Sequence, residues 1–175
     1  MNATKTIPEN HPIKQLFRSL TERGSLQVQL RDSDVLYYLA NLMVDFMFVE
    51  NMYRIRDAEN RRVEHLVDML KQAVERDMPV KKEFYKHVGD FSLFTLGIFP
   101  ESIEKPRRVS SKSFYNDAGR IGYMMAGELE SSSPHMVVFR KLADEFERCV
   151  LSLNWVREYA TDPFYQYMLR DFGVI

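Results

Sequence analysis

A row of small residues in the sequence NDAGRIGYMMAGEL constrains the fold more than any other feature of the chain. Ala118, Gly122 and Ala126 follow one another at four-residue steps, which places them on one face of a helix. A glycine inside a helix costs up to about 1 kcal/mol relative to alanine, so a close contact must compensate. We predict a tight crossing with the helix that carries Gly89 and Gly97. The alternative is a flat ligand that lies against exposed backbone.

Helical periodicity predicts an all-α protein, folded as a single-domain helical bundle of about six to seven helices over residues 1–175. The seven prolines fall between the periodic segments, as is typical of helical proteins. An apolar content of 45% in 175 residues is sufficient for one core. Residues 1–11 are predicted to be a flexible N-terminal segment. The predicted helices cover approximately residues 12–24, 33–51, 63–78, 79–99, 113–129 and 134–159, and a last short one starts at residue 162.

Apolar rows predict which helix faces are buried. The helix over residues 33–51, capped by Ser33, carries two rows and should be buried on most sides. The helix over residues 79–99 is apolar on all sides from Phe91 onward, which predicts an element enclosed by its neighbours. Ser113 is the predicted cap of the next helix. The rows are Val35, Leu39, Leu42, Phe46 and Val49; Leu36, Ala40, Met43 and Met47; and, after a charged elbow, Val63, Val67, Leu70 and Val74.

The helix over residues 134–159 carries a regular row with alternating spacings of three and four. Its members are Phe139, Leu142, Phe146, Cys149, Leu153 and Val156. Such a row is typical of a helix in an antiparallel bundle or at a dimer interface. Four C-terminal aromatic residues add apolar surface: Phe164, Tyr165, Tyr167 and Phe172. Together these features predict self-association, most simply as a homodimer.

Charge and cysteine content restrict the partners and the compartment. The chain has 24 Lys and Arg residues against 25 Asp and Glu residues, so its net charge of -1 does not favour nucleic acid or an anionic membrane. The longest apolar segments are far shorter than a membrane span, which needs roughly 20 residues. The N-terminus lacks the apolar stretch of a secretory signal, and one cysteine cannot form an internal disulfide. We therefore expect a cytoplasmic protein.

Two sets of polar residues are candidates for a site. Asp34, Tyr38, Asn41 and Asp45 form a polar stripe on the helix over residues 33–51. Such a stripe is usually a solvent edge; if it faced inward, it would line a polar cavity, and burial would raise the pKa of Asp45. The second set shares a face on the helix over residues 79–99: Glu83, His87 and Asp90. It could bind a metal or move a proton. The simpler alternative is a solvated face, on which Asp90 pairs with an arginine such as Arg120 or belongs to a buried hydrogen-bond network.

No motif for a metal or a cofactor survives inspection. A di-iron bundle needs a Glu-x-x-His motif on two helices, and none of the four histidines fits that spacing. A zinc site at a cysteine cluster is excluded by the single cysteine, and no nucleophile elbow or dinucleotide turn is present. The basic segment over residues 105–112 is not interleaved with stacking aromatic residues, so it is best explained as a solvated edge. We predict neither a metal nor a cofactor.

The segment VGDFSLFTLGIFPESI and the later segment RRVSSKSFYNDAGRIGYMMAGEL resemble an uncharacterised family of helical bacterial proteins. The resemblance covers about a quarter of the chain. It implies a bacterial origin and a shared helical fold, without an established activity. The matching residues are Gly89, Asp90, Phe94, Gly97, Phe99, Pro100, Tyr115, Gly119, Gly122 and Tyr123.

The segment YKHVGDFSLFTLG also resembles the glycine-bearing distal helix of heme oxygenases. His11 lies near the N-terminus, as the axial ligand of that family does. The doubled glycine that brings the family's backbone close to heme is absent here. The resemblance therefore supports heme only as part of an alternative function.

The favoured expectation is a non-enzymatic protein that acts through protein contacts or regulatory binding. The alternative is a protein that binds a small ligand or a cofactor, with possible enzymatic activity, in a pocket between the helices over residues 33–51, 79–99 and 113–129. The candidate pocket residues are Tyr38, Asn41, Asp45, His87, Asp90, Tyr115, Gly119 and Tyr123.

Overall fold

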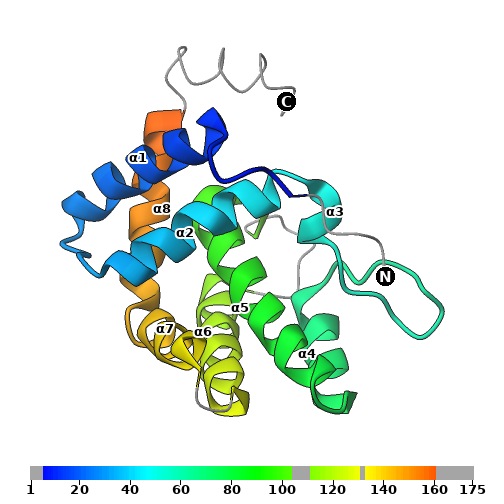
Figure 1. Cartoon of the computed structure of the whole chain (residues 1–175). Coiled ribbons are helices and arrows are strands. Elements are labelled where there is room, and N and C mark those ends of the chain that lie inside the picture. Colours follow the sequence, from blue (N-terminus) through cyan, green and yellow to red (C-terminus); the bar gives the residue numbers. More distant parts are fainter. Residues whose placement is uncertain (1–5, 104–110, 131–132, 161–175) are drawn as a thin grey trace.

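The computed structural model describes residues 6–103, 111–130 and 133–160, and within these ranges the fold is all-α (Figure 1). The only β pairing in them is an isolated bridge between Arg56 and Arg62. The helices are α1 (Pro12–Gln27), α2 (Ser33–Phe46), α3 (Val49–Met52), α4 (Leu66–Glu75), α5 (Val80–Ile98), α6 (Lys112–Leu129), α7 (Pro134–Asp144) and α8 (Phe146–Ala160), with a short 3₁₀ helix, η1, at Pro100–Ser102. The predicted bundle of about seven helices is confirmed.

Helix α5 lies at the centre of the bundle. It packs against α4, α6 and α8 and is crossed by α2 (Figure 1). Its residues from His87 to Gly97 are all buried, which confirms the prediction of an enclosed helix. Burial of a polar group without a hydrogen-bond partner costs free energy, so the polar residues of α5 are under strong structural constraint.

The predicted tight crossing of the glycine-bearing helices is confirmed at one of its two glycines. A Cβ atom on Gly122 would lie 2.7 Å from the backbone nitrogen of Gly89 and 2.7 Å from the carbonyl oxygen of Tyr85. The backbones of α5 and α6 therefore touch at this point. Gly97 does not take part, because the space beside it is filled by Leu153 of α8. The prediction that Gly97 faces α6 was wrong.

Two predicted helices are each divided in the structure. The helix expected over residues 33–51 ends at Phe46, and α3 begins at Val49, whose side chain is exposed. The helix expected over residues 134–159 is interrupted at Glu145, which has φ −99° and ψ 18°. Neither break coincides with a proline or a glycine, so no local sequence signal marks it.

Helix α4 turns a different face to the core than its valines indicated. The buried residues are Leu66, Met69 and Ala73, whereas Val67 and Val74 are exposed. The buried face also repeats at helical spacing, so periodicity alone did not distinguish the two faces.

The residues that cap α2 and α6 differ slightly from those predicted. The carboxylate of Asp32 caps α2, and the hydroxyl of Ser111 caps α6, in place of the predicted serines at positions 33 and 113.

The alternating row on α7 and α8 is buried within the chain itself. All six of its members, from Phe139 to Val156, belong to the core. The row therefore offers no free surface for a second copy, and it acts as the internal bundle face. The four C-terminal aromatic residues lie outside the described residues, and self-association stays a prediction.

None of the described helices combines the length and apolarity that crossing a bilayer requires.

Candidate functional site

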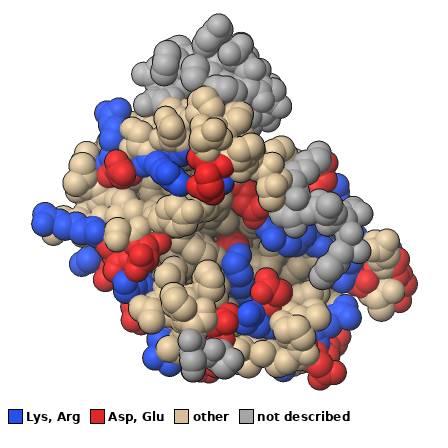
Figure 2. Space-filling view, in the orientation of Figure 1, with Lys and Arg blue, Asp and Glu red and all other residues tan. Residues whose placement is uncertain are grey.

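A cavity of about 480 Å³ lies between α2, α5 and α7. Figure 2 shows the surface hollowed near the middle of this face, with acidic and basic side chains side by side around the hollow. The volume lies within the range of about 300 to 1,000 Å³ that is typical of small-molecule sites. Its apolar and aromatic lining consists of Tyr37, Tyr38, Leu42, Pro134, Val138 and Phe139. Its polar lining consists of Asp34, Asn41, Asp45, Lys86, Asp90 and His135.

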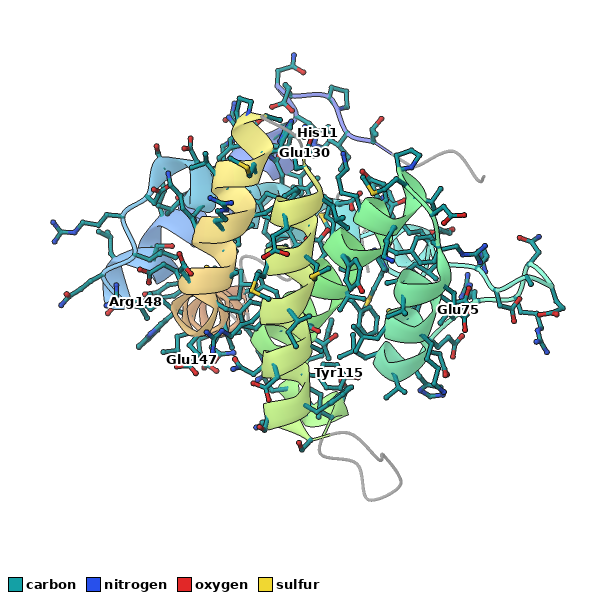
Figure 3. All side chains as sticks on the ribbon, turned by 90° about the horizontal axis from the view of Figure 1, so that it is seen from below. His11, Glu75, Tyr115, Glu130, Glu147 and Arg148 are labelled. Atoms are coloured by element: carbon teal, nitrogen blue, oxygen red, sulfur yellow. The ribbon has the colours of Figure 1, made fainter. Side chains whose placement is uncertain are left out.

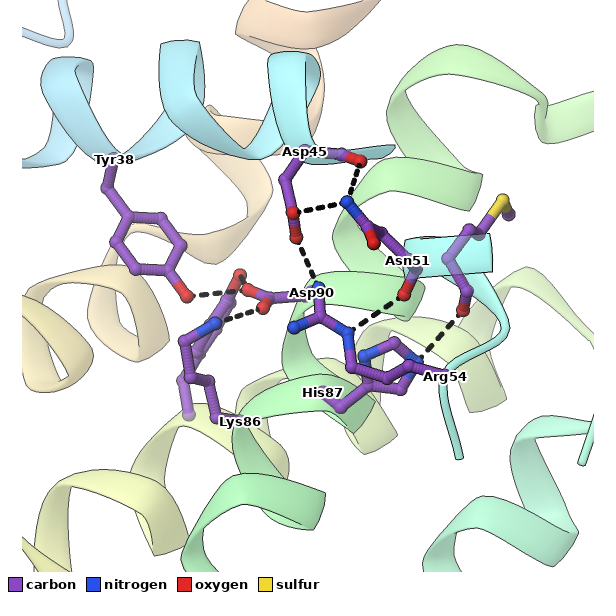
Figure 4. A network of polar contacts seen from close by, with 9 residues as sticks. Tyr38, Asp45, Asn51, Arg54, Lys86, His87 and Asp90 are labelled. Atoms are coloured by element: carbon purple, nitrogen blue, oxygen red, sulfur yellow. Dashed lines mark hydrogen bonds and ion pairs between the residues drawn. The ribbon is translucent and has the colours of Figure 1, made fainter. Parts of the chain in front are cut away.

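The innermost polar group of the cavity is the carboxylate of Asp90, which is 1% exposed. Its Oδ1 atom accepts hydrogen bonds from the hydroxyl of Tyr38 at 2.6 Å and from the hydroxyl of Tyr123 at 2.8 Å. Its Oδ2 atom accepts one from the ammonium of Lys86 at 2.6 Å. These donors come from three helices, α2, α6 and α5. Figure 4 shows Tyr38 and Lys86 pointing at the carboxylate. The predicted arginine partner was wrong: Arg120 is exposed, and Lys86 takes that role.

The network fixes the charges at this end of the cavity. Burial by itself raises the pKa of Asp90, but the ammonium of Lys86 and the two tyrosine hydroxyls outweigh it, so the pKa is lowered overall. Burial, together with the Asp90 carboxylate, raises the pKa of Tyr38 and Tyr123 well above the ordinary value. Asp90 is therefore a charged acceptor at neutral pH, and both tyrosines are neutral donors.

A second set of polar contacts lies at the C-terminal end of α2. The carboxylate of Asp45 accepts a hydrogen bond from the guanidinium of Arg54 and one from the side-chain amide of Asn51 at 2.9 Å (Figure 4). Asp45 is 29% exposed, so it lies at the cavity wall rather than in the core. The polar stripe of α2 therefore lines a cavity that opens to solvent, and it is neither a simple solvent edge nor a buried polar row.

His87 lies one residue from Lys86 but faces away from the cavity. Its Nε2 atom is 2.9 Å from the carbonyl oxygen of Met52, so Nε2 donates and Nδ1 is the bare acceptor. Nδ1 is buried without a hydrogen-bond partner among the described residues. The ring packs between Phe46 and Phe91. Burial, followed by the positive charge of Arg54, lowers the pKa of His87 to about 3.

The buried neutral imidazole predicts acid sensitivity. The unfolded chain protonates His87 near pH 6.5 and the folded chain only near pH 3, so the stability from this group is lost as the pH falls through that window. We expect the free energy of unfolding to decrease by about 3 to 5 kcal/mol from this residue alone. In His87→Gln, whose amide can still donate to the Met52 carbonyl, the pH dependence should flatten. Denaturant titrations at several pH values measure it.

The exposed residue His135 provides the control for this measurement. His135→Gln should keep the acid sensitivity of the parent, because the side chain of His135 is exposed and its replacement leaves the buried imidazole of His87 in place. An equally steep pH dependence in His87→Gln and in the parent would contradict the assignment of the effect to His87.

The structure brings together only some of the predicted pocket residues. Tyr38, Asn41, Asp45 and Asp90 line the cavity, and Tyr123 lies directly behind Asp90. His87, Tyr115 and Gly119 lie elsewhere. Tyr115 is near the start of α6, at the opposite end from Glu130 (Figure 3), and its Cα is about 12 Å along the axis from that of Tyr123. Gly119 is covered by Phe146 and Ser92.

The third wall of the cavity comes from α7, whereas α6 was predicted. The α7 residues of the lining include Val138 and Phe139, and no sequence signal distinguished these two from ordinary core residues. Lys86 was also missed, although it stands four residues before Asp90 on the same helix. Oppositely charged side chains at that spacing are neighbours, so the pair was visible in the sequence.

The glycines of α5 do not provide the backbone surface that a heme would need. A Cβ on Gly89 would lie 2.7 Å from the ring of Tyr123, and one on Gly97 would lie 2.5 Å from Leu153. Both faces are filled by side chains of the protein, so the residues present do not fit heme at this helix. At Gly122, the backbone of Tyr85 and Gly89 leaves no room for a flat ligand.

Within the described ranges, no group of three or more His, Cys, Asp or Glu residues could hold a metal ion.

The one cysteine of the chain lies in the core, and its burial limits the reactivity of its thiol. Cys149 is buried on α8, and burial raises the pKa of its thiol to about 12. A thiol in this state is a poor nucleophile at neutral pH.

Comparisons of the chain with protein-family models, curated proteins and solved structures gave no match. The resemblance to a bacterial family therefore stays a prediction.

Proposed function

We propose that the protein binds a small molecule in the cavity between α2, α5 and α7. One observation carries this proposal: the Asp90 carboxylate, the Lys86 ammonium and the Tyr38 hydroxyl converge at the inner end of a cavity whose other walls are largely apolar. Few, convergent polar groups within an apolar cavity are the usual composition of a ligand site.

The position of Lys86 favours a ligand site over a purely structural ion pair. Asp90 is fully buried, but the side chain of Lys86 is 29% exposed and its ammonium lies over the ring of Tyr38 at 5.6 Å. An ammonium has three donors, and the structure assigns one of them to Asp90. An ion pair that is fully buried in the core would present no hydrogen-bond donor to a cavity. The partly exposed Lys86 keeps N–H donors beyond the one that Asp90 accepts.

Action through protein contacts, the function favoured by the sequence, stays a prediction. Ile121 and Met124 are exposed on α6. They are three residues apart and so are neighbours on the helix surface, but two exposed apolar side chains are ordinary on a protein and do not define an interface.

Two adjacent valines on α7 allow a matched test of the cavity. Val138 lines it, whereas Val137 is 46% exposed outside it. Val138→Trp should fill the cavity and Val137→Trp should leave it open. Saturation-transfer NMR with benzyl alcohol, phenol and indole is expected to show binding to the parent and to Val137→Trp, and its loss in Val138→Trp.

Two outcomes of this NMR experiment would contradict the proposal. Absence of binding to the parent would remove it, and so would undiminished binding to Val138→Trp. Circular dichroism of both variants establishes that the helical fold is retained, so that a loss of binding can be assigned to the filled cavity.

A further inference from the structure

The charges that line the cavity are already paired within the chain. Asp90 pairs with Lys86 at 2.6 Å. Asp45 pairs with Arg54. A charged ligand would have to compete with one of these pairs, and it would also leave water for a cavity that is mostly apolar. Both effects penalise a net charge on the ligand.

A third acidic residue follows the same pattern at the cavity rim. The carboxylate of Asp34 lies 3.4 Å from the ammonium of Lys141, which also pairs with Asp32 at 2.7 Å. The acidic residues of the lining therefore do not form an open cation site. They are held by basic residues from α5, α7 and the segment after α3.

The hydrogen-bonding groups at the inner end favour a hydroxyl. The hydroxyl of Tyr38 donates its hydrogen bond to the ionised Asp90, so the lone pairs of its oxygen are the groups that can accept one. Lys86 keeps donors beyond the one directed at Asp90. Both atoms donate to the same carboxylate, Tyr38 to Oδ1 and Lys86 to Oδ2, and Figure 4 shows them converging on it. A hydroxyl, which both donates and accepts, can satisfy Tyr38 and Lys86 at once, whereas a carboxylate or an ammonium satisfies only one.

The walls of the cavity favour a ring. Tyr38 and Phe139 meet edge to face with their centroids 6.1 Å apart, and Tyr37 adds a further aromatic side chain. Aromatic walls bind a ring more favourably than an open chain. Edge-to-face and stacked contacts with a ring contribute free energy beyond that of burying apolar area.

From these observations we infer that the cavity takes an uncharged, hydroxyl-bearing ring compound. The inference rests on the proposed ligand-binding function and names the chemical class of the ligand. Its hydroxyl lies between Lys86 and Tyr38, and its ring lies between α2 and α7 against Phe139.

Three probes of nearly equal size and different charge test the ligand class. Benzyl alcohol is neutral, benzoate is an anion and benzylamine is a cation at neutral pH. Titrations of the parent protein, followed by ¹⁵N NMR shifts, are expected to show benzyl alcohol binding about fivefold or more tightly than either ion.

A variant of the polar end tests the hydroxyl. Lys86→Met is expected to weaken benzyl alcohol but to leave the binding of toluene, which has no hydroxyl, unchanged. Equal weakening of both probes would show that the variant had only disturbed the cavity, and it would overturn the hydroxyl assignment.

The outcomes separate the inference from the function on which it rests. Tighter binding of benzoate or benzylamine in this cavity would overturn the inference and leave the proposed function standing. Failure of all four probes, and of phenol and indole as well, to bind the parent would overturn both.

Discussion

Replacing Asp90 with alanine is expected to lower the free energy of unfolding by about 3 to 5 kcal/mol, the largest effect of any substitution at the candidate site. The change removes the acceptor of three hydrogen bonds, including the carboxylate to which the fully buried Tyr123 donates. It also leaves Lys86 without its counter-charge. Equilibrium denaturation in urea measures the loss.

Two further variants resolve the origin of that loss. Asp90→Asn should cost less, about 1 to 3 kcal/mol, because the amide oxygen still accepts from both tyrosines while the amide nitrogen opposes the ammonium of Lys86. Combining Asp90→Asn with Lys86→Met removes the opposed cation and should recover part of the stability. If Asp90→Ala were as stable as the parent, the network would not be the polar anchor that we describe.

Replacing Gly122 with alanine is expected to destabilise the protein by about 1 to 3 kcal/mol, and leucine should cost more. Alanine is the better helix former by up to about 1 kcal/mol, so propensity alone predicts the opposite sign. The added Cβ would meet backbone atoms of Tyr85 and Gly89, which cannot move aside as a flexible side chain can. Helices α5 and α6 would have to separate. Thermal and chemical denaturation of the variant measure the cost.

Gly127 is the matched control on the same helix. A Cβ at this position would have its nearest neighbours at 3.4 Å, which is ordinary contact. Gly127→Ala is therefore expected to be neutral or stabilising by up to about 1 kcal/mol. Equal effects at the two glycines would show that the crossing does not depend on backbone contact.

The architecture could be predicted because it follows from local rules. Apolar rows at helical spacing gave the helices, and the cost of glycine inside α6 indicated the crossing at Gly89. The breaks after Phe46 and at Glu145 could not be predicted, because no proline or glycine marks either of them. The face of α4 was misassigned because two apolar rows were available, and only the neighbouring helices decide between them.

The candidate site was predictable in part. The polar stripe that contains Tyr38 and Asp45 was visible on α2, and Asp90 stood out where α5 becomes apolar. Whether these residues share a cavity depends on how α2 crosses α5, which no local pattern encodes. The α7 wall, with Val138 and Phe139, depends on a third helix far along the chain. Pairs within one helix can be found by spacing, but a cavity is a property of several helices.

Mapping of a bound probe by methyl NMR tests the central claim most directly. On titration with benzyl alcohol, the methyl signals of Leu42 and Val138, which line the cavity, are expected to shift, and those of Leu153 and Val156 in the core of α8 should stay in place. Shifts confined to the cavity methyls would support a ligand site at the Asp90 network. Shifts at α8 without any at Leu42 and Val138, or none at all at saturating probe, would contradict it.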